Sequence, residues 1–492
     1  MKKHKNAKCI TACVLASVLI CGLCACTGQD AEDPASSYLT KDDITVSETI
    51  SNDADGEHAI EVSGEEASYS NIGVTKTGDA DGDEADFYGE NSAVFATEKA
   101  VLNISDSLIE TNGRHANAIF SYGEGTVVNI SNSVIETQGD CSGGLMTTGG
   151  GTMNAENLTI NTSGRSSAAI RSDRGGGTVN VSKGYYKTTG MGSPVIYSTA
   201  DITVSDAYME STSSQGVVVE GKNSVTLNND TLVADNNSKN SDRSDWYQAV
   251  MIYQSMSGDA AEGTSSFTAD GGSVTNKNGD IFFVTNTATE ISLSGVDITN
   301  EDAEGFFLRA AAAGWGNEGS NGGKVNLNAS GQVINGSMLV DDSSTLNLYL
   351  RDKSSFTGAI NSDGQSGDVY VEIEDGSTWT LTADSYISGL TVSAGSAIDL
   401  NGHKLYVDGK EYSAGSSSTG EAFDISNGSG SVARDGNGGS GGPGGNPPDG
   451  NPSEKPDGEP PEKPDGNGSP GEAPPDGNPP QGEPPEKSDV SI

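Results

Sequence analysis

Cysteine, histidine and cationic side chains are scarce in this sequence, and each shortage argues against a class of function. Five of the 6 cysteines precede residue 27, so Cys141 is the only later thiol and no intramolecular disulfide can form there. The 4 histidines have no metal-ligand spacing. The 27 Lys and Arg against 70 Asp and Glu give a net charge of −43, which would repel nucleic acid and anionic lipid.

Apolar residues and catalytic motifs are also in short supply. Only 33% of residues are apolar, and 66 are glycine. This apolar fraction is low for a globular core, but it suits a solenoid, whose core is thin. Between residues 27 and 430 the sequence has no G-x-S-x-G, Walker loop, C-x-x-C or H-E-x-x-H motif. Cys141 lies in a glycine-rich stretch with no histidine nearby in the sequence, so we expect a buried or turn thiol.

What the chain does have is a repeat. VLNISDSLIET at Val101–Thr111 returns 26 residues later as VVNISNSVIET at Val127–Thr137, and weaker copies follow through Ala234. A fixed period of this size is typical of stacked repeats, because one unit cannot bury its own apolar face. We therefore predict an all-β chain, a single right-handed parallel β-helix whose coils each contain three short strands.

Alternation within the repeat predicts which side chains face the core. Leu102 and Ile104 should point inward and Asn103 outward, so the equivalent Asn and Thr residues should form a hydrogen-bonded ladder along the stack. The third strand carries two adjacent apolar columns, one beginning at Val94 and one at Phe95. Which of the two faces the core stays open at this point.

The first 26 residues have a basic start and an apolar stretch too short for a stable membrane span, which indicates an export signal. Its end, Leu23-Cys24-Ala25-Cys26, resembles a bacterial lipobox, which implies lipidation of Cys26. The protein would then be exported, anchored by lipid to the bacterial cell membrane and surface-exposed. Residues 27–56 are expected to be an acidic flexible tether, 57–414 the β-helix, and 415–492 a disordered Gly/Pro/acidic tail.

Two insertions break the repeat, near 236–263 and near 310–323. Loops that leave a rigid scaffold often carry binding residues, so Trp246 and Trp315 are candidate ligand contacts, although each could instead pack its own loop. Further on, STWTLTADSYISGLTVSAGSAIDLNGHKLYVDG resembles the closing coils of autotransporter-type passenger domains. These C-terminal strands should cap the stack, and Trp379 should seal that end.

Tyrosines supply further candidate ligand contacts. Tyr185 and Tyr208 occupy equivalent positions on consecutive coils and are expected to form one flat, exposed aromatic strip. Such a strip suits the apolar faces of sugar rings, and Tyr197 is a third candidate contact. The alternative is a partly covered surface pair.

Two charged clusters could carry chemistry. Asp79, Asp81, Asp83 and Asp86 have the alternate spacing of oxygen-rich loops that bind calcium, the one expected cofactor; the alternative is a solvated acidic loop.

Arg171, Asp173 and Arg174 form the second cluster, and Glu220 should lie two coils further on. Pectate-lyase-like β-helices, which the chain resembles in fold, use an Arg or Lys base and calcium-binding Asp residues. The alternative for this cluster is structural ion pairing at the coil corners.

The resulting expectation is a monomeric, non-enzymatic cell-surface adhesin or glycan-binding protein, whose partner is a polysaccharide or host glycan. It would touch the membrane only through its lipid and would not bind nucleic acid. The alternative is a polysaccharide lyase or glycoside hydrolase acting on an acidic polysaccharide, with Arg171, Asp173 and Arg174 as the catalytic group.

Overall fold

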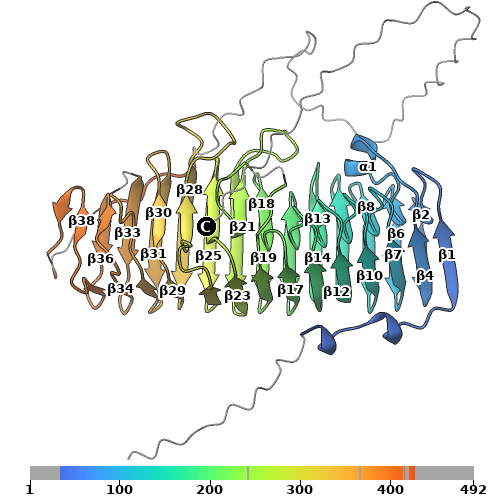
Figure 1. Ribbon diagram of the computed structural model, residues 1–492, viewed down its shortest axis with the longest axis horizontal. Helices are drawn as coiled ribbons and strands as arrows, with labels where there is room; N and C mark the ends of the chain where they lie inside the picture. Colours follow the sequence, from blue (N-terminus) through green and yellow to red (C-terminus); the bar gives the residue numbers. More distant parts are fainter. Residues whose placement is uncertain (1–33, 241–242, 365–366, 414, 416–419, 427–492) are drawn as a thin grey trace, which may run out of the picture. The chain divides into compact units, whose positions relative to one another are not determined.

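The computed structural model describes residues 34–240, 243–364, 367–413, 415 and 420–426. The predicted signal segment, Cys26 and nearly all of the predicted tail lie outside these residues. The described part is almost entirely parallel β-sheet (Figure 1), apart from the short helices η1 (Pro34–Ser37), η2 (Lys41–Asp43) and α1 (Asp83–Phe87). None of its helices is long and apolar enough to cross a membrane.

The largest sheet has 21 strands and collects the first and second strands of the repeat. Its strands are β1 (Glu48–Asn52), β3 (Glu66–Ser70), β4 (Ile72–Lys76), β6 (Val101–Ser105), β7 (Leu108–Thr111), β9 (Val127–Ser131), β10 (Val134–Thr137), β12 (Gly151–Thr162), β14 (Gly177–Thr188), β16 (Asp201–Ser205), β17 (Tyr208–Ser211), β19 (Ser224–Asn228), β20 (Thr231–Ala234), β22 (Thr264–Asp270), β23 (Ser273–Asn276), β25 (Thr287–Ser294), β26 (Asp297–Asn300), β28 (Gly323–Ser330), β31 (Thr345–Arg351), β33 (Asp368–Ile373) and β36 (Gly389–Val392).

The other sheets are smaller. The 11-stranded sheet comprises β2 (Ile60–Ser63), β5 (Val94–Thr97), β8 (Ile119–Tyr122), β11 (Leu145–Thr148), β13 (Ile170–Ser172), β15 (Ile196–Ser198), β18 (Val217–Glu220), β21 (Gln248–Tyr253), β24 (Asp280–Thr285), β27 (Leu308–Ala310) and β30 (Met338–Val340). Two short sheets comprise β29 (Val333–Asn335), β32 (Ser355–Thr357), β34 (Thr378–Thr380) and β37 (Ala397–Asp399), and β35 (Ser385–Ile387), β38 (Leu405–Val407) and β39 (Lys410–Glu411).

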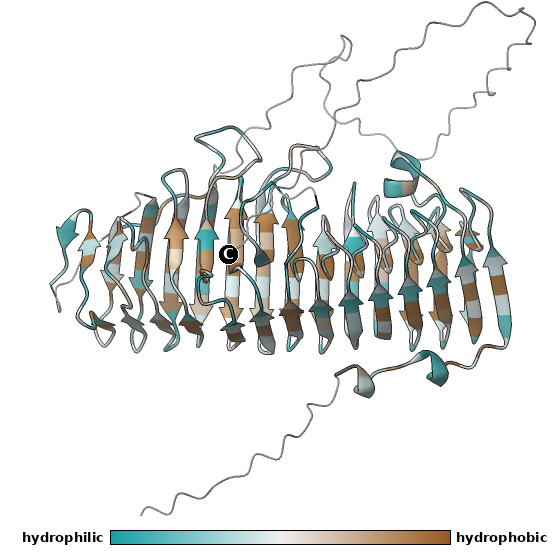
Figure 2. Cartoon of the chain, viewed as in Figure 1, coloured by the Kyte–Doolittle hydropathy of each residue, from teal (hydrophilic) through white to brown (hydrophobic). Residues whose placement is uncertain are grey.

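The repeat sets the register of these sheets. β6 pairs with β9 in parallel, with Leu102 opposite Val128 and Asn103 opposite Asn129, which is the alignment of the two sequence copies. Leu102 and Ile104 are buried, as predicted, and their counterparts join one continuous apolar core. Figure 2 shows the alternation of apolar and polar residues along the strands that this register requires.

The predicted asparagine ladder is present on the outer face. Asn129 Nδ2 donates to Asn103 Oδ1 at 2.9 Å, Asn154 to Asn129 at 2.9 Å, and Asn180 to Asn154 at 3.0 Å. Each amide in the middle of the ladder therefore donates one hydrogen bond and accepts one. The ladder ties the strands of four consecutive repeats together without using their backbone groups.

Breaking this ladder in its middle should lower stability modestly. Asn154→Ala removes two hydrogen bonds between half-exposed side chains, so we expect the free energy of unfolding to fall by about 1 kcal/mol. Chemical denaturation followed by circular dichroism measures the change. Thr226→Ala, in the same column but beyond the ladder, is the control and should change stability by less than about 0.5 kcal/mol.

The third strands settle which apolar column faces inward. In the 11-stranded sheet Val94 lies opposite Ile119, Ile119 opposite Leu145, and Leu145 opposite Ile170, and all four belong to the main core. The outward column starts at Phe95. Alignment of the repeats in the sequence predicts that the column of Val94 continues through Met146, Val218, Met251, Phe283 and Phe307. This alignment is wrong by one residue at each of these places, because the first four belong to the outward column and the last precedes the strand.

The segment expected to be a flexible tether is partly ordered. η1 and η2 lie within it, and β1 pairs in parallel with β4, so the sheet begins at Glu48. At the other end Phe423 accepts a hydrogen bond on its carbonyl from Asn347 Nδ2 at 2.9 Å, so residues 420–426 lie against β31. The ordered part of the chain therefore extends beyond both predicted boundaries.

Candidate functional site

The outer face of the 11-stranded sheet carries different side chains, and is covered by different segments, along its length. Its outward column runs Phe95, Phe120, Met146, Arg171, Tyr197, Val218, Met251, Phe283 and Arg309. At one end α1 covers the column, where Phe95, Phe120 and Met146 form a separate apolar cluster. At the other end the two inserted loops cover it, and between these covers lies a cavity of about 370 Å³.

The loop tryptophans pack onto this face. Trp315 joins Val218, Met251 and Phe283 in an apolar cluster and lines the cavity, with its ring 5.0 Å from that of Tyr253. Trp246 lies 5.5 Å from Phe283 and outside the cavity. The predicted loop residues therefore separate into Trp315, which faces the cavity, and Trp246, which holds its loop against the sheet.

Charged side chains form the floor between the covers. Arg171 Nη2 donates to Asp173 Oδ2 at 2.9 Å, and both residues line the cavity. Burial raises the pKa of Asp173, and Arg171 opposes that rise. Arg174 lies at the edge, where it pairs with Asp259 at 2.5 Å and with Asp83 at 3.0 Å and stacks on Phe87. Arg174 therefore ties α1 to the first inserted loop.

A carboxylate behind the cavity orients two tyrosines. Tyr197 and Tyr253 line the cavity, and both hydroxyls donate to Glu220 Oε2, Tyr253 at 3.0 Å. Burial raises the pKa of Glu220, while hydrogen bonds oppose that rise. Burial also raises the pKa of both tyrosines, so their hydroxyls stay protonated and donate to Glu220. Sequence reasoning named Tyr197 and Glu220 but missed Tyr253.

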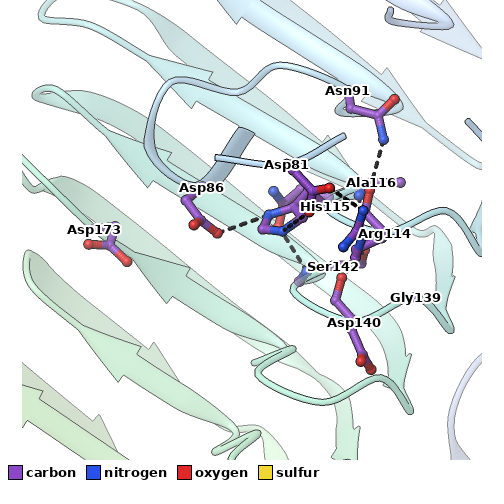
Figure 3. A network of polar contacts seen from close by, with 12 residues as sticks. Asp81, Asp86, Asn91, Arg114, His115, Ala116, Gly139, Asp140, Ser142 and Asp173 are labelled. Atoms are coloured by element: carbon purple, nitrogen blue, oxygen red, sulfur yellow. Dashed lines mark hydrogen bonds and ion pairs between the residues drawn. The ribbon is translucent and has the colours of Figure 1, made fainter. Parts of the chain in front are cut away.

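The acidic loop that was predicted to bind calcium spreads its carboxylates over different partners (Figure 3). Asp79 Oδ1 accepts the Arg114 backbone N–H at 2.7 Å, and Asp81 pairs with the Arg114 guanidinium. Asp83 pairs with Arg174 at 3.0 Å. Asp86 Oδ1 lies 2.9 Å from His115 Nδ1. Calcium binding by this loop stays a prediction, and it would require these carboxylates to leave their present partners.

The same loop brings together residues that the sequence did not connect. Asp86, His115 and Cys141 each offer one ligand atom, and these atoms lie within 4.8 Å of one another. The contact with Asp86 and then that with Cys141 raise the pKa of His115 to about 9. Asp86 and Cys141 both line the cavity.

Tyr185 and Tyr208 lie elsewhere, on the 21-stranded sheet. They stack at 5.4 Å with 7° between their planes, as expected for equivalent positions. However, Tyr38 lies 5.5 Å from Tyr185 and 6.4 Å from Tyr208, and Tyr185 is only 4% exposed. Lys41 fixes this cover by pairing with Glu110 and Glu136. The expected open strip is thus a covered pair.

Comparison of the chain with protein-family models, with curated proteins and with solved structures finds no match. Function is therefore argued from the geometry of the cavity alone.

Proposed function

We propose that the chain binds carbohydrate in the cavity on the outer face of the 11-stranded sheet. The observation that carries the proposal is the combination of aromatic rings and buried hydrogen-bonding groups around one cavity. Tyr197, Tyr253 and Trp315 offer ring faces and edges to sugar C–H groups, while Arg171 and Asp173 offer fixed polar atoms. The cavity volume lies within the range of about 300–1,000 Å³ usual for ligand sites.

The proposal also covers the fold that carries this site and the location of the protein. We infer that the parallel sheets form a right-handed β-helix, since successive strands of each sheet come from successive repeats. The chain would be an exported, non-enzymatic adhesin or glycan-binding protein held by lipid on Cys26. That setting is supported by the lipobox resemblance and by the strongly acidic composition.

Charge favours a neutral glycan over a uronate polymer. Arg171 is paired with Asp173, and Arg174 with Asp83 and Asp259, so the positive charge of each guanidinium is already balanced by a carboxylate of the chain. Asp86 adds another carboxylate to the lining. A uronate chain would bring its own negative charges to these groups.

Array binding and titration test the proposal. We expect the chain to bind a set of neutral oligosaccharides, and Trp315→Ala to weaken that binding about tenfold or more, since losing an aromatic contact of this kind costs roughly 1–2 kcal/mol. Tyr208→Ala, which removes a tyrosine on the other sheet, should leave binding unchanged. If Tyr208→Ala weakened binding and Trp315→Ala did not, the ligand would bind at the Tyr185–Tyr208 pair instead.

An activity assay separates binding from catalysis. Incubation with acidic and neutral polysaccharides should yield no shorter products and no unsaturated uronate ends. Cleavage that is lost in Asp173→Asn would replace the binding proposal with the lyase or hydrolase alternative.

A further inference from the structure

Asp86, His115 and Cys141 are brought together by two different features of the fold. His115 and Cys141 occupy the same corner of consecutive coils, since His115 N donates to Asp140 O at 3.0 Å and Cys141 N to Arg165 O at 2.8 Å. The corner glycines before them stack so closely that a Cβ on Gly139 would lie 1.9 Å from the Gly113 carbonyl oxygen. Asp86 arrives separately, on α1.

We propose that Asp86, His115 and Cys141 form a binding site for a transition-metal ion, most suitably Zn²⁺. A carboxylate oxygen, an imidazole nitrogen and a thiolate sulfur are the ligand types that zinc takes in proteins. Tetrahedral zinc with bonds of about 2.0–2.3 Å needs ligand atoms about 3.3–3.7 Å apart. Zinc binding would therefore move the Asp86 carboxylate and His115 Nδ1 apart from their present 2.9 Å and draw in any ligand atoms that are now up to 4.8 Å apart.

The burial of His115 and its contact with Asp86 also support a metal ion at this place. The side chain is 6% exposed, and its Nδ1 forms an ion pair with the Asp86 carboxylate at 2.9 Å whose geometry falls short of a hydrogen bond. A metal ion shared by this nitrogen and the carboxylate would take the place of the proton that the ion pair holds now, because a histidine ligand must be deprotonated at the binding nitrogen.

A second carboxylate lies beside the ring nitrogen of His115 that would not bind the metal. Asp81 Oδ1 lies 3.8 Å from His115 Nε2, on the other ring nitrogen (Figure 3). Histidines that bind metal through one nitrogen commonly donate the other N–H to a carboxylate, which fixes the ring. Among the described residues the neighbouring guanidiniums make their ion pairs elsewhere, Arg171 with Asp173 and Arg174 with Asp83 and Asp259.

Three protein ligands leave one position of a tetrahedral ion open, as in catalytic rather than structural zinc sites. Because Asp86 and Cys141 line the cavity, that position would face the space where we propose that carbohydrate binds. The metal would then hold a water or a sugar hydroxyl. Metal binding itself does not depend on what else the cavity takes.

Cobalt(II) titration of the full-length reduced chain tests the site, because Co²⁺ occupies zinc sites and its thiolate complexes absorb light. We expect a thiolate-to-cobalt band that Zn²⁺ abolishes and that is absent from both Cys141→Ser and His115→Ala. The histidine variant matters because the cysteines before residue 27 could bind cobalt but do not depend on His115. Asp140→Asn, which alters a carboxylate next to Cys141 but outside the cluster, is the control and should keep the band.

Calorimetry with Zn²⁺ alone supplies the affinity. His115→Ala should weaken zinc binding at the site more than about 100-fold, since losing partners outside the ligand shell already costs 10–100-fold. A band that persists in Cys141→Ser and His115→Ala would overturn the proposal. So would a wild-type Cys141 that alkylates rapidly at a rate unaffected by excess zinc, because that result would identify a free reactive thiol.

Discussion

Replacing Trp379 with alanine is expected to lower the free energy of unfolding by about 4 kcal/mol. The indole is fully buried, stacks on Phe356 at 5.5 Å and donates from Nε1 to the Gly358 carbonyl at 3.0 Å. Strand pairing places Phe356, Trp379 and Ile398 in one column, so the cavity left by alanine would open between consecutive coils. Denaturation followed by circular dichroism gives the overall change.

The effect should also be local, because each coil of a repeat array contacts mainly its neighbours. Hydrogen exchange should accelerate in β32, β34 and β37 while β6 and β9 keep their protection. Trp246→Ala, which removes an indole from the outer face, should cost clearly less than Trp379→Ala. An equal loss for the two variants would contradict the assignment of Trp379 to the main core.

Removing the guanidinium of Arg309 should cost about 3–5 kcal/mol at neutral pH. Arg309 Nε lies 2.6 Å from Asp280 Oδ2, and the two residues are 8% and 1% exposed. Arg309→Met would leave the Asp280 carboxylate buried without its cation. The Arg309 guanidinium also stacks on the Trp246 ring. Arg351→Met is the matched control, because Arg351 likewise stacks on an aromatic ring and pairs with Glu374 at 2.9 Å, but at the surface. It should cost less than about 1 kcal/mol.

The Arg309→Met deficit should shrink as the pH falls. Burial already raises the pKa of Asp280, and loss of Arg309 would raise it further. A carboxyl whose pKa is higher in the folded than in the unfolded state binds protons preferentially in the folded state, so acidification through that interval favours folding. The double variant Asp280→Asn/Arg309→Met should recover most of the loss at neutral pH. A deficit that does not change with pH would show that lost packing, not the unpaired charge, causes it.

The sequence predicted the strands well where one face is apolar and the other polar. In VLNISDSLIET the alternation identifies Leu102 and Ile104 as core and Asn103 as outward, and the structure agrees. The third strand lacks this contrast, because loops cover its outer face and make that face apolar too. Val217 and Val218 look alike in the sequence, yet Val217 packs in the main core and Val218 packs against Trp315.

Only some residues of the candidate site could have been predicted from the sequence. The repeat offset alone could have placed Cys141 beside His115, since the two residues are 26 positions apart, but a search for ligands close in sequence missed them. Asp86 and Trp315 come from inserted segments, whose positions no repeat predicts. The cover over Tyr185 comes from Tyr38, which lies far away along the chain.

We propose that carbohydrate binds in the cavity between α1 and the inserted loops. The most direct measurement is a crystal structure of the chain soaked with an oligosaccharide selected on the array. We predict sugar density against Trp315, Tyr253 and Tyr197, with hydrogen bonds to Arg171 or Asp173. Density confined to the outer face of the 21-stranded sheet, beside the asparagine ladder or the Tyr185–Tyr208 pair, would contradict the account.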